Sequence, residues 1–282
     1  SLNLAKCLEA LEAQTLDRSR FEIIVIDNES SDNVEQVVSK YDSRELLHEL
    51  QPGSYCARNK GILESKGDIL ALTDSDCIPD KNWLNCGFLS FADKADAGFI
   101  AGRLTFFPQD ENNLNAAELW EMFHNYHSED CVKVMHFGLT ANLFVRRGVF
   151  NKVGLFNQDL KSAGDYEWGN RVYDQGLGIY YDENAVVKHP ARRTLSSLIN
   201  KTRRLIGGQL EAGLVSKSYC LKKIMIDVFP PVLTVFRLLK RDDIKSLGRA
   251  DYKIKFLFVF VVLRYVGVYE MARLLLRGKS IR

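Results

Sequence analysis

The sequence predicts an α/β protein: a doubly wound, mostly parallel sheet followed by a basic, apolar helical tail. The main observation is that short apolar runs rich in branched residues alternate with amphipathic segments of helical period. A second observation is composition: 282 residues that are 46% hydrophobic and 26% charged supply enough apolar material for a core and exclude a disordered or collagen-like chain.

The first strands are expected at Phe21–Asp27, Leu46–Leu50 and Ile69–Thr73, because short branched-rich runs are typical of strands buried on both faces. Further strands are expected near Ala97–Leu104, Asn142–Arg146 and Ala185–Lys188. Helical patterns lie between the first three strands, which is the βαβ alternation of a parallel sheet.

The expected helices are Leu4–Ala13, Asn33–Tyr41 with Ser31 or Asp32 as its N-cap, and Cys56–Glu64. The chain thus begins in a helix, whereas a doubly wound sheet normally opens with a strand that becomes central. We therefore expect the first strand to be missing from this sequence.

The charge is distributed unevenly along the chain. Residues 1–200 hold 20 Lys and Arg against 30 Asp and Glu, whereas residues 201–282 hold 18 against 6. The tail also has two apolar stretches, Leu221–Leu239, which Pro230–Pro231 interrupts, and Phe256–Leu276, which carries three charged residues. Basic residues among long aliphatic runs suit an anionic membrane surface better than nucleic acid, and we expect docking without a clean span. The alternative is that both stretches are ordinary core helices.

The strongest chemical signal is Asp74 and Asp76, which directly follow the Ile69–Thr73 strand. Ligands of open α/β sheets bind beyond the carboxyl ends of strands. Two carboxylates on one side of the chain there repel each other unless a cation lies between them. The alternative is an ordinary polar turn.

Four other motifs accompany this acidic pair in a fixed order. The full set is Asp27–Asp32, Ala57–Gly61, Asp74–Asp76, Asn142–Arg147 and Gly164–Glu167. Over residues 1–205 this set resembles a GT-A glycosyltransferase of family 2. The resemblance implies a GT-A-like catalytic domain at residues 1–205, with a helical, membrane-associating tail at residues 206–282.

The resemblance also implies roles for single residues. Asp165 would be the general base, and Asp76, Asp74 and His189 would hold Mn²⁺ or Mg²⁺, although a lone histidine is more often structural. The residues expected to bind the nucleotide sugar are Asp27, Asn28, Arg58, Asp74, Asn142, Arg203 and Arg204.

The function so implied is transfer of a sugar, with inversion, from a nucleotide-diphosphate donor such as a UDP-sugar to a hydroxyl acceptor. We expect a lipid-linked or cell-envelope glycan as acceptor and action at the cytoplasmic face of the membrane. Two alternatives stay open: a nucleotidyltransferase of the sugar-phosphate type, and a membrane-associated scaffold that keeps the fold without the chemistry.

Overall fold

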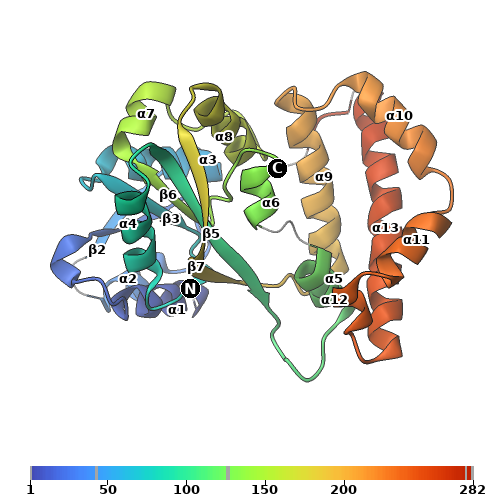
Figure 1. Cartoon of the computed structure of the whole chain (residues 1–282), viewed down its shortest axis with the longest axis horizontal. Coiled ribbons are helices and arrows are strands. Elements are labelled where there is room, and N and C mark those ends of the chain that lie inside the picture. The colour runs from blue at the N-terminus through green and yellow to red at the C-terminus, as the bar shows by residue number, and fades with distance from the viewer. Residues whose placement is uncertain (1, 42–43, 125–127, 277, 281–282) are drawn as a thin grey trace. The chain divides into compact units, whose positions relative to one another are not determined.

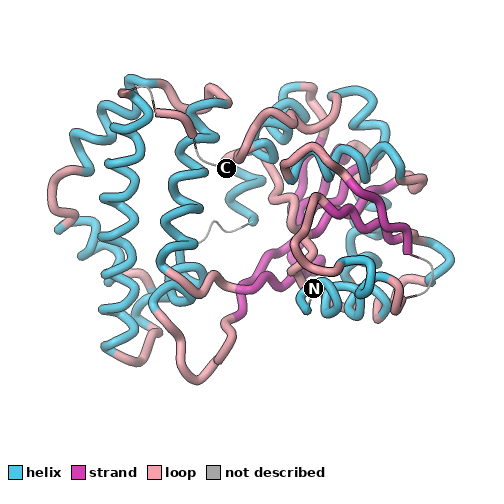
Figure 2. The backbone as a smooth tube through the Cα atoms, turned by 180° about the vertical axis from the view of Figure 1, so that it is seen from behind, coloured by secondary structure: helices cyan, strands magenta, loops and turns pink. Residues whose placement is uncertain are grey.

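The structure is a computed structural model that describes residues 2–41, 44–124, 128–276 and 278–280. The chain divides into two compact units (Figure 1). The first comprises residues 1–105, 126–159 and 164–189, and the second comprises residues 106–125, 160–163 and 190–282. Strands flanked by helices make up the first unit, while helices dominate the second (Figure 2).

The first unit follows the predicted alternation closely. Its elements, in chain order, are α1 (Leu2–Glu12), η1 (Arg18–Arg20), β1 (Ile23–Asp27), α2 (Val34–Val38), β2 (Arg44–His48), α3 (Ser54–Glu64), β3 (Ile69–Thr73), β4 (Ile78–Pro79), α4 (Trp83–Asp93), β5 (Ala97–Phe107), α6 (Ser128–Lys133), β6 (Asn142–Arg146), α7 (Arg147–Val153), α8 (Gly164–Asp174) and β7 (Gly178–Pro190). The last residues of β5 and β7 belong to the second unit. The N-cap of α2 is Asn33, whose side chain accepts from the Gln36 N–H, rather than Ser31 or Asp32.

The strand pairing corrects one prediction. β1 and β2 are parallel, as expected, with Ile23 opposite Arg44 and Asp27 opposite His48. The larger sheet has the order β3-β6-β5-β7-β4, and every pair in it with a defined register is antiparallel. The physical reason is that β6 enters between β3 and β5 and runs opposite to both. The α/β class is confirmed, but the described strand pairs are mixed rather than mostly parallel: β1 and β2 pair in parallel, and the pairs of the larger sheet with a defined register are antiparallel.

The core of the first unit is built around bulky side chains that face the sheet. Leu4, Leu8 and Leu11 repeat at the spacing of one helix face and are buried in the core cluster on which α1 packs, beside β4 and α2. Trp83 of α4 and Phe144 of β6 lie with ring centroids 5.0 Å apart. A Cβ at Gly87 would overlap the Phe144 ring, so α4 approaches the sheet only because this residue is glycine.

The second unit is helical. It contains α5 (Ala116–His124), α9 (Leu195–Glu211), α10 (Lys217–Asp227), α11 (Val232–Leu239), α12 (Asp242–Lys245) and α13 (Ala250–Leu275). The long helix α13 packs against α5, α9 and α10. The predicted domain boundary at residue 205 falls inside α9, because that helix continues to Glu211 along α13. Among the described helices, none combines the length and apolar character needed to cross a membrane.

Candidate active site

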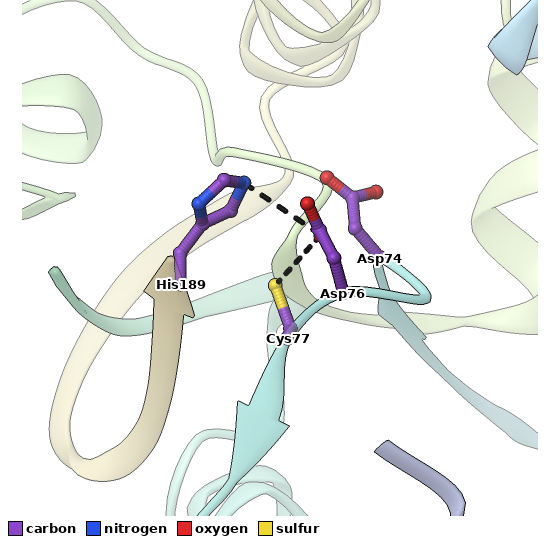
Figure 3. Close-up of side chains that lie close together, drawn as sticks. All are labelled: Asp74, Asp76, Cys77 and His189. Carbon is purple, nitrogen blue, oxygen red and sulfur yellow. Dashed lines mark hydrogen bonds and ion pairs between the residues drawn. The ribbon is translucent and has the colours of Figure 1, made fainter. Parts of the chain in front are cut away.

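Four potential metal ligands gather where β3 ends and β4 begins. Asp74 follows β3, and the Cys77 N–H donates to the Asp74 carbonyl over 3.0 Å, which closes a turn that carries Asp76. β4 then pairs with β7, with Ile78 opposite Lys188, so His189 arrives beside that turn. The potential ligand atoms of Asp74, Asp76, Cys77 and His189 all lie within 4.8 Å of one another (Figure 3).

The chemistry of this cluster fits a divalent cation. His189 Nε2 lies 3.8 Å from Asp76 Oδ1 (Figure 3). Two carboxylates and an imidazole are a ligand set suited to Mn²⁺, and carboxylate oxygen also suits Mg²⁺. Burial and the two neighbouring aspartates raise the pKa of the Cys77 thiol, which disfavours the thiolate. The residues predicted from sequence as ligands are therefore brought together.

Arg58 of α3 reaches the same edge of the sheet and binds Asp74. Its guanidinium Nη2 lies 2.5 Å from Asp74 Oδ1, and the side chain is only 17% exposed. Burial alone would lower the pKa of Arg58, but the Asp74 carboxylate, together with Tyr55 and Asp165, outweighs burial and raises that pKa. Arg58 therefore stays charged and supplies a fixed positive charge beside the metal-ligand cluster.

Asp165 lies in the first turn of α8 and interacts electrostatically with Arg58 and Asp74. Burial raises the pKa of its carboxyl group, and Arg58 partly opposes this shift. One carboxylate oxygen accepts the Tyr166 N–H over 3.0 Å. The predicted general base thus sits at a helix start on the same unit as the ligand cluster, with a proton affinity above that of an ordinary aspartate.

Tyr55, which sequence reasoning missed, fixes the start of α8. Its phenol oxygen accepts the Gly164 N–H over 2.8 Å and lies 3.4 Å from the Asp165 N–H. A Cβ at Gly164 would lie 2.6 Å from the Tyr55 ring, so glycine is needed for this approach. The place of Tyr55 in the sequence could have indicated this role. Tyr55 precedes the Ala57–Gly61 motif by two residues and lies one helical turn before Arg58.

Asp27 and Asn28 form the polar turn after β1. Asp27 accepts the Ser30 N–H, and the Ser30 side chain is the main cause that lowers the pKa of the Asp27 carboxyl, with smaller contributions from the Ser30 N–H and His48. The Asn28 amide donates to the Glu49 and Gln51 carbonyls, and its oxygen accepts the Gly53 N–H. The Asn28 side chain therefore positions the segment that leads into α3. Its contact with the nucleotide stays a prediction.

The geometry of Asn142 does not support its predicted contact with the nucleotide. This residue is 1% exposed, and its amide oxygen accepts the Trp83 indole N–H over 2.8 Å. Its amide nitrogen donates to the Arg103 and Ala185 carbonyls. The physical reason is topology: because β6 lies inside the larger sheet, its first residue joins neighbouring elements in the core.

Arg203 and Arg204, predicted to bind the diphosphate, belong to α9 in the second unit. The Arg203 guanidinium donates to the buried Glu270 carboxylate over 2.9 Å, so its charge is already paired within that unit. Arg204 is half-buried and has no ion-pair partner in the described part of the chain.

Comparison with known proteins agrees with the fold. The family model described as glycosyl transferase family 2 matches residues 1–154. The glycosyltransferase AglE of Haloferax volcanii is 35% identical over 221 residues, which cover 76% of this chain and 71% of that protein. The chain therefore belongs to glycosyl transferase family 2, and by class it is a glycosyltransferase.

More distant relatives share only part of their length with this chain. The pre-mycofactocin glycosyltransferase of Mycobacterium tuberculosis is 26% identical over 184 residues, and the match covers 63% of this chain and 39% of that protein. A mannosyltransferase from Pyrobaculum calidifontis, solved in complex with GDP-Man and Mn²⁺, is similar in structure with a TM-score of 0.64 and 15% identity. That similarity covers 99% of this chain and 84% of the other, and it confirms the predicted GT-A-like fold.

Proposed function

We propose that this chain is an inverting, metal-dependent glycosyltransferase that moves a sugar from a nucleotide-diphosphate donor to a hydroxyl group. The observation that carries the proposal is the gathering of Asp74, Asp76 and His189 at one sheet edge, in electrostatic reach of Arg58 and Asp165. Metal ligands, a fixed cation and a carboxylate base are the groups that such a transfer needs.

Asp76, His189 and Asp74 would hold Mn²⁺ or Mg²⁺. Such an ion neutralises the negative charge that develops on a diphosphate leaving group. Arg58 holds the Asp74 carboxylate in place through their ion pair and keeps a positive charge at the edge of the sheet. These residues bind and orient the donor rather than exchange protons.

Asp165 accepts the proton of the acceptor hydroxyl. As the acceptor oxygen bonds to the anomeric carbon, the bond from that carbon to the diphosphate oxygen breaks, and the configuration inverts in this single displacement. The raised pKa of Asp165 makes its carboxylate a better proton acceptor than an ordinary aspartate. Tyr55 keeps the base at its place by holding the first N–H groups of α8.

For the donor we propose a UDP-sugar. The similar mannosyltransferase from Pyrobaculum calidifontis was solved with GDP-Man, which makes a guanosine donor the main rival. For the acceptor we propose a lipid-linked or cell-envelope glycan, with the protein acting at the cytoplasmic face of the membrane. The support for this location is the excess of basic residues among apolar stretches in residues 201–282.

The test is a panel of UDP- and GDP-sugars assayed with the full chain in Mn²⁺, in Mg²⁺ and in EDTA. Release of nucleoside diphosphate that depends on the divalent ion supports the proposal. Release of pyrophosphate from a sugar phosphate and a nucleoside triphosphate would instead identify a nucleotidyltransferase. Nucleotide binding without turnover under every condition would identify a non-catalytic scaffold.

A further inference from the structure

The second unit carries a concentrated set of exposed apolar side chains along α10 and α11. We call this set the apolar ridge, and its members are Leu221, Met225, Ile226, Val228, Phe229, Val232, Leu233 and Phe236. All are more than half exposed, and Met225 and Leu233 are 70% and 72% exposed. A large exposed apolar patch on a protein marks an interaction site.

The ridge is exposed because the opposite face of α10 is used for packing. Cys220 and Asp227, two helical turns apart, are buried where α10 meets α13. Arg264 of α13 donates to the Ile226 and Asp227 carbonyls and pairs with the Asp227 carboxylate over 2.8 Å. These contacts fix the end of α10 on α13, which lies between α9 and the α10–α11 pair in Figure 1. The packing of α10 on α13 therefore fixes which face of α10 is exposed, and the ridge lies on that face.

The exposed charges of residues 217–240, the segment that contains the ridge, are all positive. Between residues 217 and 240 the single acidic residue is Asp227, which is buried and paired with Lys223 and Arg264. The exposed cations of this segment, for which the described chain offers no ion-pair partner, are Lys217, Lys222, Arg237 and Lys240. The surface thus combines aromatic and aliphatic groups with unneutralised positive charge at its two ends.

We propose that the apolar ridge inserts into the headgroup region of a bilayer that contains anionic phospholipid, with α10 and α11 lying in the membrane plane. Interfacial helices gain from burying an apolar face, and nearby cations add electrostatic attraction. A second copy of this chain is a poorer occupant, because a two-fold contact would bring the same four cations of both copies together. The inference deepens the proposed action at the membrane face by naming the surface that binds lipid.

The experiment is flotation of the full chain with phosphatidylcholine vesicles that contain or lack phosphatidylglycerol. We expect binding to the anionic vesicles that weakens as salt is raised. Leu233→Glu/Phe236→Glu should abolish this binding, since both side chains project from one face of α11. Lys222→Ala/Arg237→Ala should weaken it by about 30-fold, because each cation near an anionic surface contributes about fivefold.

Matched controls are Leu63→Glu/Leu89→Glu and Lys40→Ala/Lys81→Ala, exposed positions of the first unit that should bind vesicles as the parent does. Equal binding of the Leu233→Glu/Phe236→Glu protein, or binding that ignores anionic lipid, would overturn the proposal. A dimer that this variant dissociates would assign the ridge to a second copy instead. Sugar transfer to a soluble acceptor should be unchanged in the variant, so failure of the docking proposal and failure of the proposed reaction are distinguishable.

Discussion

The guanidinium of Arg58 and the carboxylate of Asp74 lie 2.5 Å apart, and this ion pair makes the two aspartates of the acidic pair unequal. The Asp74 carboxylate is already paired with a cation, Arg58, whereas Asp76 Oδ1 lies 3.8 Å from the His189 imidazole. A cation that binds here gains more from Asp76, because the charge of Asp74 is largely neutralised. We therefore expect Asp76 to be the principal ligand.

Asp76→Asn should weaken Mn²⁺ binding by more than about 100-fold, because loss of a direct ligand costs more than loss of an outer-shell partner. Isothermal titration calorimetry with Mn²⁺ measures the change, and transfer should fall in parallel. Asp68→Asn removes an exposed carboxylate of the same unit and should leave both quantities unchanged. Full transfer activity of the parent in EDTA, or unchanged Mn²⁺ affinity in Asp76→Asn, would remove the metal assignment.

Asp165→Asn should lower the rate of transfer by about two to four orders of magnitude, which is the usual contribution of a positioned general base. The amide keeps the shape of the side chain but does not take up the proton, so nucleotide affinity should be nearly unchanged. Single-turnover rates and calorimetry with the nucleoside diphosphate measure the two effects. Loss of nucleotide affinity together with turnover would show that Asp165 has a structural role.

The pH dependence of kcat/KM should report the same residue. Burial raises the pKa of Asp165, and the base must be deprotonated, so activity is lost as pH falls through that raised pKa. The midpoint of the acid limb should therefore lie above about 3.9, the ordinary value for aspartate. In Asp165→Asn the residual activity should lack this limb. An acid limb that persists there would belong to another group.

Tyr55→Phe should reduce the rate of transfer while leaving Mn²⁺ affinity unchanged. The substitution removes the oxygen that accepts the Gly164 N–H and faces the Asp165 N–H, so the start of α8 is held less firmly. The loss of a hydrogen bond should also lower the free energy of unfolding by about 1 kcal/mol. Tyr180→Phe, which removes an exposed hydroxyl bonded to Asp96, is the control. If Tyr55→Phe lowers the free energy of unfolding but changes neither the rate of transfer nor the pH profile of kcat, Tyr55 contributes only to stability.

Local sequence signals predicted the strands and the site residues that follow them better than they predicted strand direction. The Ile69–Thr73 and Asn142–Arg146 strands were placed correctly, because branched apolar runs report burial. Their antiparallel pairing depends on the long connection between them, which composition does not encode. Asp74 and Asp76 were predicted because they follow a strand, and His189 through the resemblance to the family; the β4–β7 register brings the three together.

Local sequence signals predicted less well the role of polar residues whose side chains form hydrogen bonds within the fold. Asn28 and Asn142 occupy motif positions, but their side-chain amides form hydrogen bonds with groups that are distant in sequence. The partners are backbone carbonyls and, for Asn142, the Trp83 indole. The role of Tyr55 was not predicted for a similar reason, since its hydrogen-bond partner Gly164 is 109 residues away in sequence. Such pairings depend on tertiary structure, and periodicity or spacing alone does not reveal them.

Asn142→Ala should lower the free energy of unfolding by about 2–4 kcal/mol, because it leaves a buried indole N–H and two carbonyls without partners and opens a cavity. Nucleotide affinity of the folded variant should match that of the parent. Asn85→Ala on α4 is the control. A selective loss of nucleotide affinity, with stability unchanged, would restore the sequence-based prediction that Asn142 contacts the donor.

The last prediction concerns Glu270, a fully buried carboxylate of α13 that accepts hydrogen bonds from Arg203 of α9 and Arg273. Burial opposes its ionisation, but hydrogen bonds from the two arginines outweigh this and lower the pKa of Glu270. A carboxyl whose folded-state pKa is lowered stabilises the fold at neutral pH, and that contribution is lost as pH falls through the folded-state value.

Glu270→Gln should therefore lower the free energy of unfolding at pH 7 by about 2 kcal/mol, the contribution expected of hydrogen bonds to a charged group. Arg203 and Arg273 are 28% and 25% exposed, so water can solvate their guanidinium groups when the carboxylate is removed. The loss of stability is therefore smaller than for a fully buried charge left without a partner. Urea denaturation measured from pH 7 down to about pH 3, below the ordinary pKa of glutamate, tests both effects. The variant should lose less stability on acidification than the parent, whereas the exposed Glu111→Gln should behave as the parent does. Equal stability of the parent and Glu270→Gln at pH 7 would show that this ion-pair network does not hold α9 on α13.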